Sequence, residues 1–302
     1  MALGVLTIGI AVSAYAVWSN SFANTGNDFD TDTLNPPAGL TASVSGPSID
    51  LNWTATPDTY ADNYKVLRGT AAGGPYSEIA TVTPVTITTY TDSTATAGTR
   101  YYYVLQTSEA TNWLSLNSNE ANAAVPLNTG FLSCTANAAV TTSSGDNNGF
   151  QTNPGNACAN DGAFAEDLNG GTANSTSCTS TARDRHLFYN YGFSIPAGQT
   201  INGIEVRLDA WADSTSGNPA MCVELSWDGG TSWTAAKTSP NLTTAEATYI
   251  LGSATDTWGR TWSSSTDFTN ANFRVRITDV ATSTARDIRL DWVAVQVTYS
   301  PP

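Results

Sequence analysis

The chain has 302 residues, enough for about two domains, and only 13% of them are charged, giving a formal net charge of −14 with a single histidine. Binding to nucleic acid requires clustered Lys and Arg side chains that neutralise phosphates. The twelve basic residues here are scattered along the chain, so we exclude nucleic-acid partners.

Residues 1–35 are predicted to serve export or assembly. The run 1–18 is uncharged and largely apolar, and the first basic residue of the chain is Lys65. A membrane span needs about 20 apolar residues, so two interpretations stay open. The run is either a signal peptide cleaved after Ala16 in an A-x-A motif, or a retained helix that packs against copies of itself. The residues expected to make those assembly contacts are Leu3, Val5, Leu6, Ile8, Gly9, Ile10, Val12, Tyr15, Val17 and Trp18.

The segment after this run carries a resemblance to fibre proteins. Asn24-Thr25-Gly26-Asn27 is followed by Phe29 and by Thr33-Leu34, which resembles the signal-to-mature junction of camelysin-type biofilm-fibre subunits. The retained helix instead resembles a type IV pilin, although Val5 stands where bacterial pilins usually place a glutamate. Both resemblances imply a surface filament made of copies of this chain. In it, either a helix over residues 1–22 packs at the axis, or residues 17–34 add as a donor strand to the next subunit.

Residues 36–127 are predicted to form a sandwich of about seven short strands, because apolar and polar residues alternate between closely spaced turn signals. Trp53 falls on the second strand, and Ala97-Gly98-Thr99-Arg100-Tyr101 precedes a long strand. Both features resemble a fibronectin type III domain, which implies a buried Trp53, a buried Tyr101 and a role as a spacer. The expected strands lie in 40–46, 48–53, 62–69, 76–82, 99–108 and 118–126.

Residues 129–302 are predicted to form a disulfide-containing β jelly roll, so that the whole chain is mainly β. Segments 201–212 and 288–299 alternate strictly, which predicts strands with one buried and one solvent-exposed face. Roughly eight strands with long connections favour a jelly roll, and the segment resembles bacterial surface and carbohydrate-binding modules of that type. We expect Trp233 and Trp292 in its core. Further strands are expected in 186–195, 220–227 and 271–280.

The cysteines indicate an extracellular protein. All four lie in the second half of the chain without C-x-x-C spacing, and the single His186 does not favour a zinc site. An even number in a chain that looks exported predicts two disulfides, formed in an oxidising compartment. Three pairings are possible, and proximity in the sequence favours Cys134–Cys158 and Cys178–Cys222.

One turn and one group of carboxylates in the jelly roll could carry chemistry. The segment 226–233, Ser-Trp-Asp-Gly-Gly-Thr-Ser-Trp, resembles the Asp-box of sialidase-like repeats, which implies a hairpin built around Asp228 rather than a catalytic site. Carboxylates on loops or strand ends could bind calcium through hard oxygen ligands. We expect no cofactor other than, at most, a structural calcium ion. The candidate ligands are Asp161, Asp167, Asp209 and Asp291.

The aromatic residues of the jelly roll suggest a second chemistry. Trp211, Tyr249, Trp258 and Trp262 could stack on sugar rings, although aromatic side chains in β proteins more often fill the core.

No catalytic constellation is found in the sequence, so we expect the chain not to be an enzyme. No serine near His186 lies in a nucleophile elbow, and no phosphate loop or dinucleotide fingerprint is present. The expected function is that of a structural subunit of an extracellular, cell-surface filament that displays β domains for adhesion. Its expected partners are copies of itself, surface glycans and other cells. The alternative is a secreted, monomeric carbohydrate-binding protein whose signal peptide has been cleaved.

Overall fold

The computed structural model describes residues 33–109 and 113–302. Their regular structure consists of β-strands and one short 3-10 helix, Pro154–Ala157. The predicted N-terminal helix and its assembly residues 3–18 lie outside the described residues. Within the described part of the chain, no helix has the length and apolar character needed to cross a membrane.

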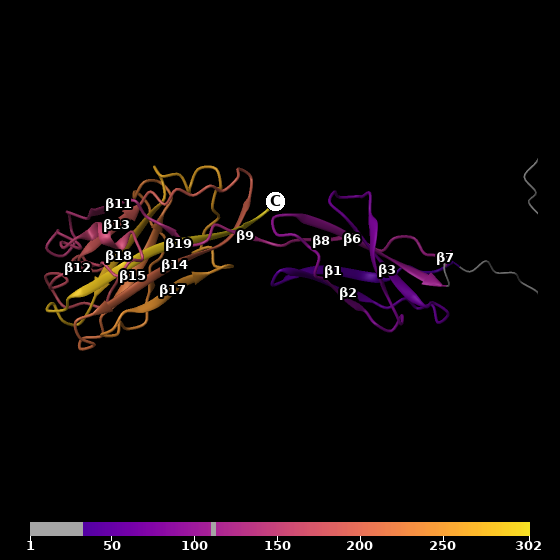
Figure 1. Cartoon of the computed structure of the whole chain (residues 1–302), viewed down its shortest axis with the longest axis horizontal. Helices are drawn as coiled ribbons and strands as arrows, with labels where there is room; N and C mark the ends of the chain where they lie inside the picture. Colours follow the sequence, from indigo (N-terminus) through magenta and orange to yellow (C-terminus); the bar gives the residue numbers. More distant parts are fainter. Residues whose placement is uncertain (1–32, 110–112) are drawn as a thin grey trace, which may run out of the picture. The chain divides into compact units, whose positions relative to one another are not determined.

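The first domain is a sandwich of two antiparallel sheets (Figure 1). One sheet has the order β1-β2-β5, and the other has the order β4-β3-β6-β7, with β8 also paired to β6. The strands are β1 (Ala38–Ser45), β2 (Ser48–Thr54), β3 (Asn63–Gly69), β4 (Ser77–Val82), β5 (Thr89–Asp92), β6 (Arg100–Glu109), β7 (Trp113–Leu114) and β8 (Ala121–Ala124).

The core of this sandwich follows from the alternation of its strands. On β2, Ile49, Leu51 and Trp53 are buried, while the residues between them face solvent or are half-buried. Trp53 keeps 6% of its surface exposed and Tyr101 keeps 7%. The Tyr101 hydroxyl accepts a hydrogen bond from the backbone N–H of Thr96 at 3.3 Å. This bond ties the turn before β6 to Tyr101, the residue that the sequence predicted to be buried there, and we call it the tyrosine corner.

The sandwich begins two residues earlier than predicted. Asn35 donates a hydrogen bond from its backbone N–H to Asp58 Oδ2 at 2.6 Å and another from its side-chain amide to Asp58 Oδ1 at 2.9 Å. Leu34 is buried. These two residues, which we had assigned to the N-terminal segment, are therefore held by the sandwich.

The second domain is also built from two antiparallel sheets. One has the order β10-β19-β14-β17, with β9 and β12 also paired to β19, and we call it the six-stranded sheet. The other has the order β11-β13-β18-β15-β16 and is called the five-stranded sheet. The strands are β9 (Leu127–Asn128), β10 (Leu132–Ser133), β11 (Ala136–Ala139), β12 (Ala165–Asp167), β13 (Arg185–Tyr189), β14 (Thr200–Ala212), β15 (Ala220–Ser226), β16 (Lys237–Thr238), β17 (Ala247–Ser253), β18 (Arg274–Val280) and β19 (Ile288–Ser300).

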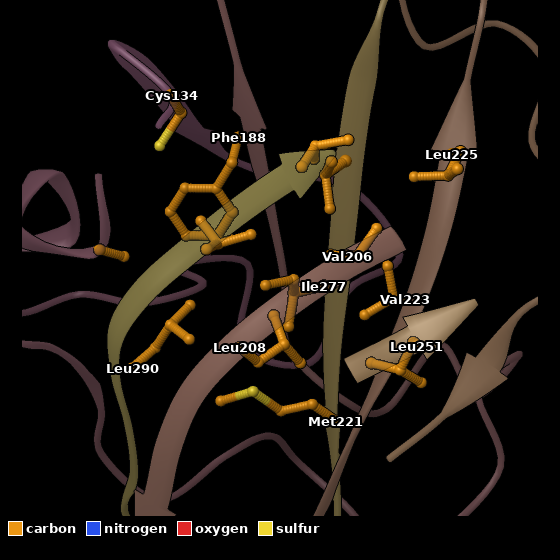
Figure 2. Close-up of a cluster of buried hydrophobic side chains, with 14 of the residues drawn as sticks. Cys134, Phe188, Val206, Leu208, Met221, Val223, Leu225, Leu251, Ile277 and Leu290 are labelled. Carbon is orange, nitrogen blue, oxygen red and sulfur yellow. The ribbon is translucent and has the colours of Figure 1, made fainter. Parts of the chain in front are cut away.

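The strand order in these sheets is that of a jelly roll. The eight main strands are β10 and β13 to β19, which we count in chain order from one to eight. In this count the six-stranded sheet has the order 1-8-3-6, from β10-β19-β14-β17, and the five-stranded sheet has the order 2-7-4-5, from β13-β18-β15-β16. Two nested Greek keys produce this order. The core lies between the sheets, where Val206 and Leu208 of β14 meet Val223 of β15 and Ile277 of β18 (Figure 2).

Both disulfides form with the favoured pairing, Cys134–Cys158 and Cys178–Cys222. They close loops of 24 and 44 residues in the jelly roll. Such bridges indicate an oxidising environment, extracellular or periplasmic.

Two strand expectations need correction. The expected strand 186–195 ends at Tyr189, because Asn190 has a positive φ of 60° and cannot continue an extended strand. Strand β17 was not anticipated, since its sequence, ATYILGS, has a short and irregular apolar pattern between polar loops.

Candidate ligand-binding face

The outer face of the six-stranded sheet gathers aromatic and charged side chains. On β14 the alternation that buries Val206 and Leu208 turns Arg207, Asp209 and Trp211 to the opposite side. On β19 the register shifts, so that Asp209 is opposite Trp292 and Ala210 is opposite Leu290. The extra residue at this β-bulge is Asp291, and a bulge lets two consecutive side chains point to the same side.

We had expected Trp292 in the core. It lies instead on this outer face. It is half-buried, and its ring contacts Phe131, with ring centroids 6.4 Å apart. Its indole N–H donates a hydrogen bond to Ser133 Oγ at 2.8 Å, and the Arg207 guanidinium lies 4.9 Å from its ring centroid. The indole is thus fixed at one edge while part of the ring stays accessible.

A second aromatic pair lies on the same sheet. Trp211 and Phe164 have ring centroids 5.0 Å apart in an edge-to-face arrangement. The Arg289 guanidinium lies 5.7 Å from the Phe164 ring and binds Glu166 at 2.7 Å. Because Trp211 pairs with Arg289 across β14 and β19, this pair and the Trp292 pair are both attached to these two central strands.

A hydrogen-bonded polar centre lies beside Trp292, which is opposite Asp209 across β14 and β19. Arg207 Nε donates to Asp209 Oδ1 at 3.0 Å, and Thr248 Oγ1 donates to the same oxygen at 2.5 Å. Arg207 Nη2 also lies 2.9 Å from Asp209 Oδ2. These contacts fix the guanidinium over the Trp292 ring, and they present a charged, oriented group beside a flat aromatic surface.

One end of this face is acidic. The Asp291 carboxylate accepts a hydrogen bond from the Gly162 N–H at 3.1 Å. Burial raises the pKa of Asp291, and the neighbouring Asp161 and Asp209 carboxylates add to the rise. Burial also raises the pKa of Glu246, with Asp291 and Asp209 as further causes. Asp291 is 1% exposed, so a ligand rich in hydroxyl groups could donate hydrogen bonds to the exposed Glu246 carboxylate.

The calcium candidates do not form a ready metal site. Asp161 is exposed on the loop before β12, Asp209 and Asp291 are 2% and 1% exposed on β14 and β19, and Asp167 is buried on β12. Across residues 33–109 and 113–302, no group of three or more His, Cys, Asp or Glu side chains is arranged to hold a metal ion. The sequence could not decide this, because it does not show which carboxylates meet.

The sugar-stacking candidates divide between the core and the face. Trp258 and Trp262 are each 5% exposed and Tyr249 is 8% exposed, and all three lie in the jelly-roll core. Only Trp211 lies on the outer face. Sequence reasoning missed Phe131, Phe164 and Trp292 as surface aromatics. The spacing of Arg207, Asp209 and Trp211, two residues apart on a strand, was a signal that one face carries them all.

The Asp-box segment is a structural hairpin, as its sequence predicted. Asp228 Oδ1 accepts hydrogen bonds from the backbone N–H groups of Ser232 at 2.8 Å and Thr231 at 3.1 Å. These bonds lower the pKa of Asp228, and the bond from Ser232 has the largest effect. Trp233 is half-buried rather than in the core, because its ring packs against the Arg276 guanidinium, 4.1 Å from the ring centroid.

His186 is a buried structural residue. Its Nδ1 accepts a hydrogen bond from the Phe150 N–H at 3.2 Å, and its Nε2 lies 2.9 Å from Asn137 Oδ1. Burial lowers the pKa of His186 to about 4, so the ring is neutral near pH 7. Both ring nitrogens are engaged by structural partners, which leaves neither to act as a general base.

Comparison with known proteins yields partial similarities. No protein-family model matches the chain, and no curated protein matches it. A β-1,2-glucanase from Parabacteroides distasonis is 24% identical over 31% of this chain and 13% of its own, with a TM-score of 0.27. A pectate lyase from Pectobacterium carotovorum is 23% identical over 34% of this chain and 33% of its own, also with a TM-score of 0.27. The chain thus spans about a third or less of each enzyme.

In a third similarity, the match covers nearly all of the other chain. A fibronectin type III-like protein from Clostridium thermocellum is 40% identical over 30% of this chain and 92% of its own length, with a TM-score of 0.27. The strand order of the first sandwich and its tyrosine corner agree with that sequence identity. The chain therefore contains a fibronectin type III-like β-sandwich.

Proposed function

We propose that this chain is an extracellular adhesion protein in which the fibronectin type III-like sandwich is a spacer and the jelly roll binds carbohydrate. The observation that carries this proposal is the outer face of the six-stranded sheet. There, Trp211 and the Arg207–Asp209 pair lie on β14, and Trp292 lies opposite Asp209 on the neighbouring strand β19.

The chemistry of this face suits a sugar chain. A pyranose ring has an apolar C–H surface that can pack on a half-exposed aromatic ring, in the way that aromatic side chains cover apolar surface generally. Its hydroxyl groups can donate to the exposed Glu246 and accept from the half-buried Arg207. Since Arg207 is already fixed by Asp209 and Thr248, little side-chain freedom would be lost on binding. We propose a binding role rather than catalysis, because His186 is engaged by structural partners.

Binding to a panel of polysaccharides, measured with the full chain by affinity electrophoresis and calorimetry, tests this function. We expect Trp292→Ala and Trp211→Ala each to weaken binding about tenfold or more, since a well-packed aromatic anchor contributes about 2 kcal/mol or more. Trp233→Ala is the matched control, because Trp233 is equally half-buried but lies beside the five-stranded sheet. Equal losses for all three variants, or no binding to any glycan, would refute the proposal.

We further propose that residues 1–33 assemble the protein into a pilus-like or biofilm-fibre filament on the cell surface. The support is the uncharged, apolar run 1–18, which a stable surface protein must either bury against its own copies or discard. Deletion of residues 1–33, which spares the buried Leu34, should then give a soluble monomer with both β domains folded, as judged by negative-stain microscopy and light scattering. If the shortened chain still polymerised, the β domains would drive assembly.

The rival is a secreted, monomeric carbohydrate-binding protein. Intact mass of the protein isolated from its native source distinguishes the two, because cleavage after Ala16 removes the apolar run. Loss of that run together with monomeric particles would favour the secreted protein. Glycan binding by the outer face is expected in either case, so the two tests are independent.

A further inference from the structure

Four charged side chains are buried together at one edge of the jelly roll. They are Asp167 on β12, Asp279 on β18, and Arg183 and Asp184 just before β13. Asp167, Arg183 and Asp279 are 0% exposed, and Asp184 is 2% exposed. We call them the buried acid cluster. It joins the two sheets, because β12 belongs to the six-stranded sheet and β18 to the five-stranded sheet.

The cluster has more acceptors than donors. Arg183 Nη2 lies 3.6 Å from Asp279 Oδ2, and Arg183 Nε donates to the Asp279 backbone carbonyl at 3.1 Å. Both carboxylate oxygens of Asp167 and both of Asp279 lack a hydrogen-bond donor among the described residues. A Cβ atom on Gly170 would lie 2.2 Å from Asp279 Oδ2, so the chain closes tightly over these oxygens.

Other groups around the cluster do not supply the missing donors. The Asp146 backbone N–H donates to Asp184 Oδ1 at 3.0 Å, and the Asp146 side chain adds another carboxylate nearby. The loop before β19 contributes acceptors at this edge, because the Ser283 carbonyl accepts from Arg183 Nη1 at 3.4 Å and the Arg286 carbonyl accepts from the Gly170 N–H at 3.1 Å. Its Arg286 side chain is paired with Asp213 at 3.2 Å, and its Asp287 carboxylate accepts from the Asn169 N–H at 3.1 Å.

Charge balance in this enclosed site requires a proton. If all three carboxylates of the cluster were ionised, Arg183 would leave two negative charges uncompensated in a dry interior, which is strongly unfavourable. A protonated carboxyl group removes one charge and supplies the donor that the neighbouring carboxylate lacks. A bound cation is the other solution, but no group of three or more His, Cys, Asp or Glu side chains among the described residues is arranged to hold a metal ion, and Arg183 already provides the positive charge.

We propose that Asp167 is protonated in the folded protein at neutral pH and shares this proton with Asp279, whose negative charge is balanced by Arg183. The resulting carboxyl–carboxylate hydrogen bond is a proton-dependent link between the two sheets of the jelly roll. Burial, and then the Asp279 charge, raises the pKa of Asp167 to about 12. Burial also raises the pKa of Asp279, and burial followed by Asp279 raises that of Asp184 to about 7.

The link makes the jelly roll less stable as the pH rises. An aspartate in the unfolded chain has a pKa of about 3.9, so above this pH the unfolded state releases a proton that the folded state keeps. The contribution of the link is fully present below about pH 4 and is lost progressively up to the raised pKa of Asp167. Within this range each retained proton raises the unfolding equilibrium constant about tenfold per pH unit.

The window from about pH 7.5 to about pH 9 isolates Asp167, because histidine, ordinary carboxylates and most tyrosines do not change protonation there. We would measure urea unfolding of the full chain across this window. The transition that shifts on disulfide reduction belongs to the jelly roll. For the wild type, its unfolding equilibrium constant should rise about 30-fold over 1.5 pH units. In Asp167→Asn, whose amide can donate to Asp279 without a titrating proton, it should stay constant.

Asp161→Asn is the matched control, because it removes an exposed carboxylate from the loop before β12 and should keep the wild-type slope. A flat wild-type profile, or an unchanged slope in Asp167→Asn, would overturn the proposal. So would stabilisation by calcium or destabilisation by a chelator at pH 9, which would identify a cation in place of the proton. If Asp167→Asn does not fold, the infrared spectrum of the wild type at pH 8 decides: a protonated-carboxyl band is expected, and its absence refutes the link.

Discussion

Truncation of Trp53 tests both the packing of the first sandwich and its independence from the jelly roll. The indole is 6% exposed and meets the Tyr64 ring edge-on, with centroids 5.4 Å apart. Trp53→Ala therefore removes a nearly enclosed ring and leaves a cavity, which typically costs about 3–5 kcal/mol. A small domain has a total stability of about 5–15 kcal/mol, so the variant sandwich should be at or near its unfolding threshold.

Calorimetry and urea unfolding of the full chain would measure this effect. We expect the sandwich transition to fall steeply, while the jelly-roll transition stays in place, because the two domains have separate hydrophobic cores. Trp113→Ala is the matched control: this indole is 40% exposed and only stacks on Tyr60, so the loss should be about 1 kcal/mol. If the two transitions moved together in Trp53→Ala, the assignment of separate cores would be wrong.

Three further predictions concern stability. Reduction of both disulfides should destabilise only the jelly roll, by about 3 and 4 kcal/mol for the two loops, measured as a shift of one of two melting transitions. Hydrogen bonds from Thr94, Arg68 and Tyr103 outweigh burial and lower the pKa of Asp92, so the sandwich should lose stability as the pH falls through that lowered pKa, and Asp92→Asn should remove this acid sensitivity. Gly170→Ala should destabilise the jelly roll strongly, because the added Cβ would press on Asp279, whereas Gly162→Ala meets no atom within 4 Å and is strained only by its positive φ. Equal melting temperatures for the two glycine variants would refute the tight closure.

Asp92 in the sandwich and Asp167 in the jelly roll should consequently make opposite contributions to the pH dependence of stability. The sandwich holds a depressed carboxylate at Asp92, which stabilises it above the ordinary pKa of aspartate, whereas the jelly roll holds a raised one at Asp167. Hydrogen bonds to the charged form explain the first shift, and burial without such donors explains the second.

Much of the fold could be predicted because its signals are local. Period-two alternation identified β14 and β19, since residues two apart in a strand share one face. The segment around Tyr101 identified the corner of the sandwich because its turn and hydroxyl contact lie within a few residues of each other. The even number of cysteines predicted two disulfides, and the favoured one of three possible pairings, which joins each cysteine to a neighbour in chain order, is confirmed. Trp53 could be assigned from its place on an alternating strand.

The functional surfaces depended on strand pairing, which the sequence does not express locally. Trp292 meets Arg207 only because β14 and β19 pair in one register, and it faces outward because a bulge at Asp291 breaks the alternation that had suggested a core position. Asp167, Asp184 and Asp279 lie far apart along the chain, with several strands between Asp184 and Asp279. The jelly-roll topology nevertheless buries them around Arg183. The sequence by itself therefore determined the β class, the sandwich and the presence of two disulfides. Only the tertiary structure decided which aromatics stay accessible and which carboxylates must share a proton, because both depend on contacts between strands far apart along the chain.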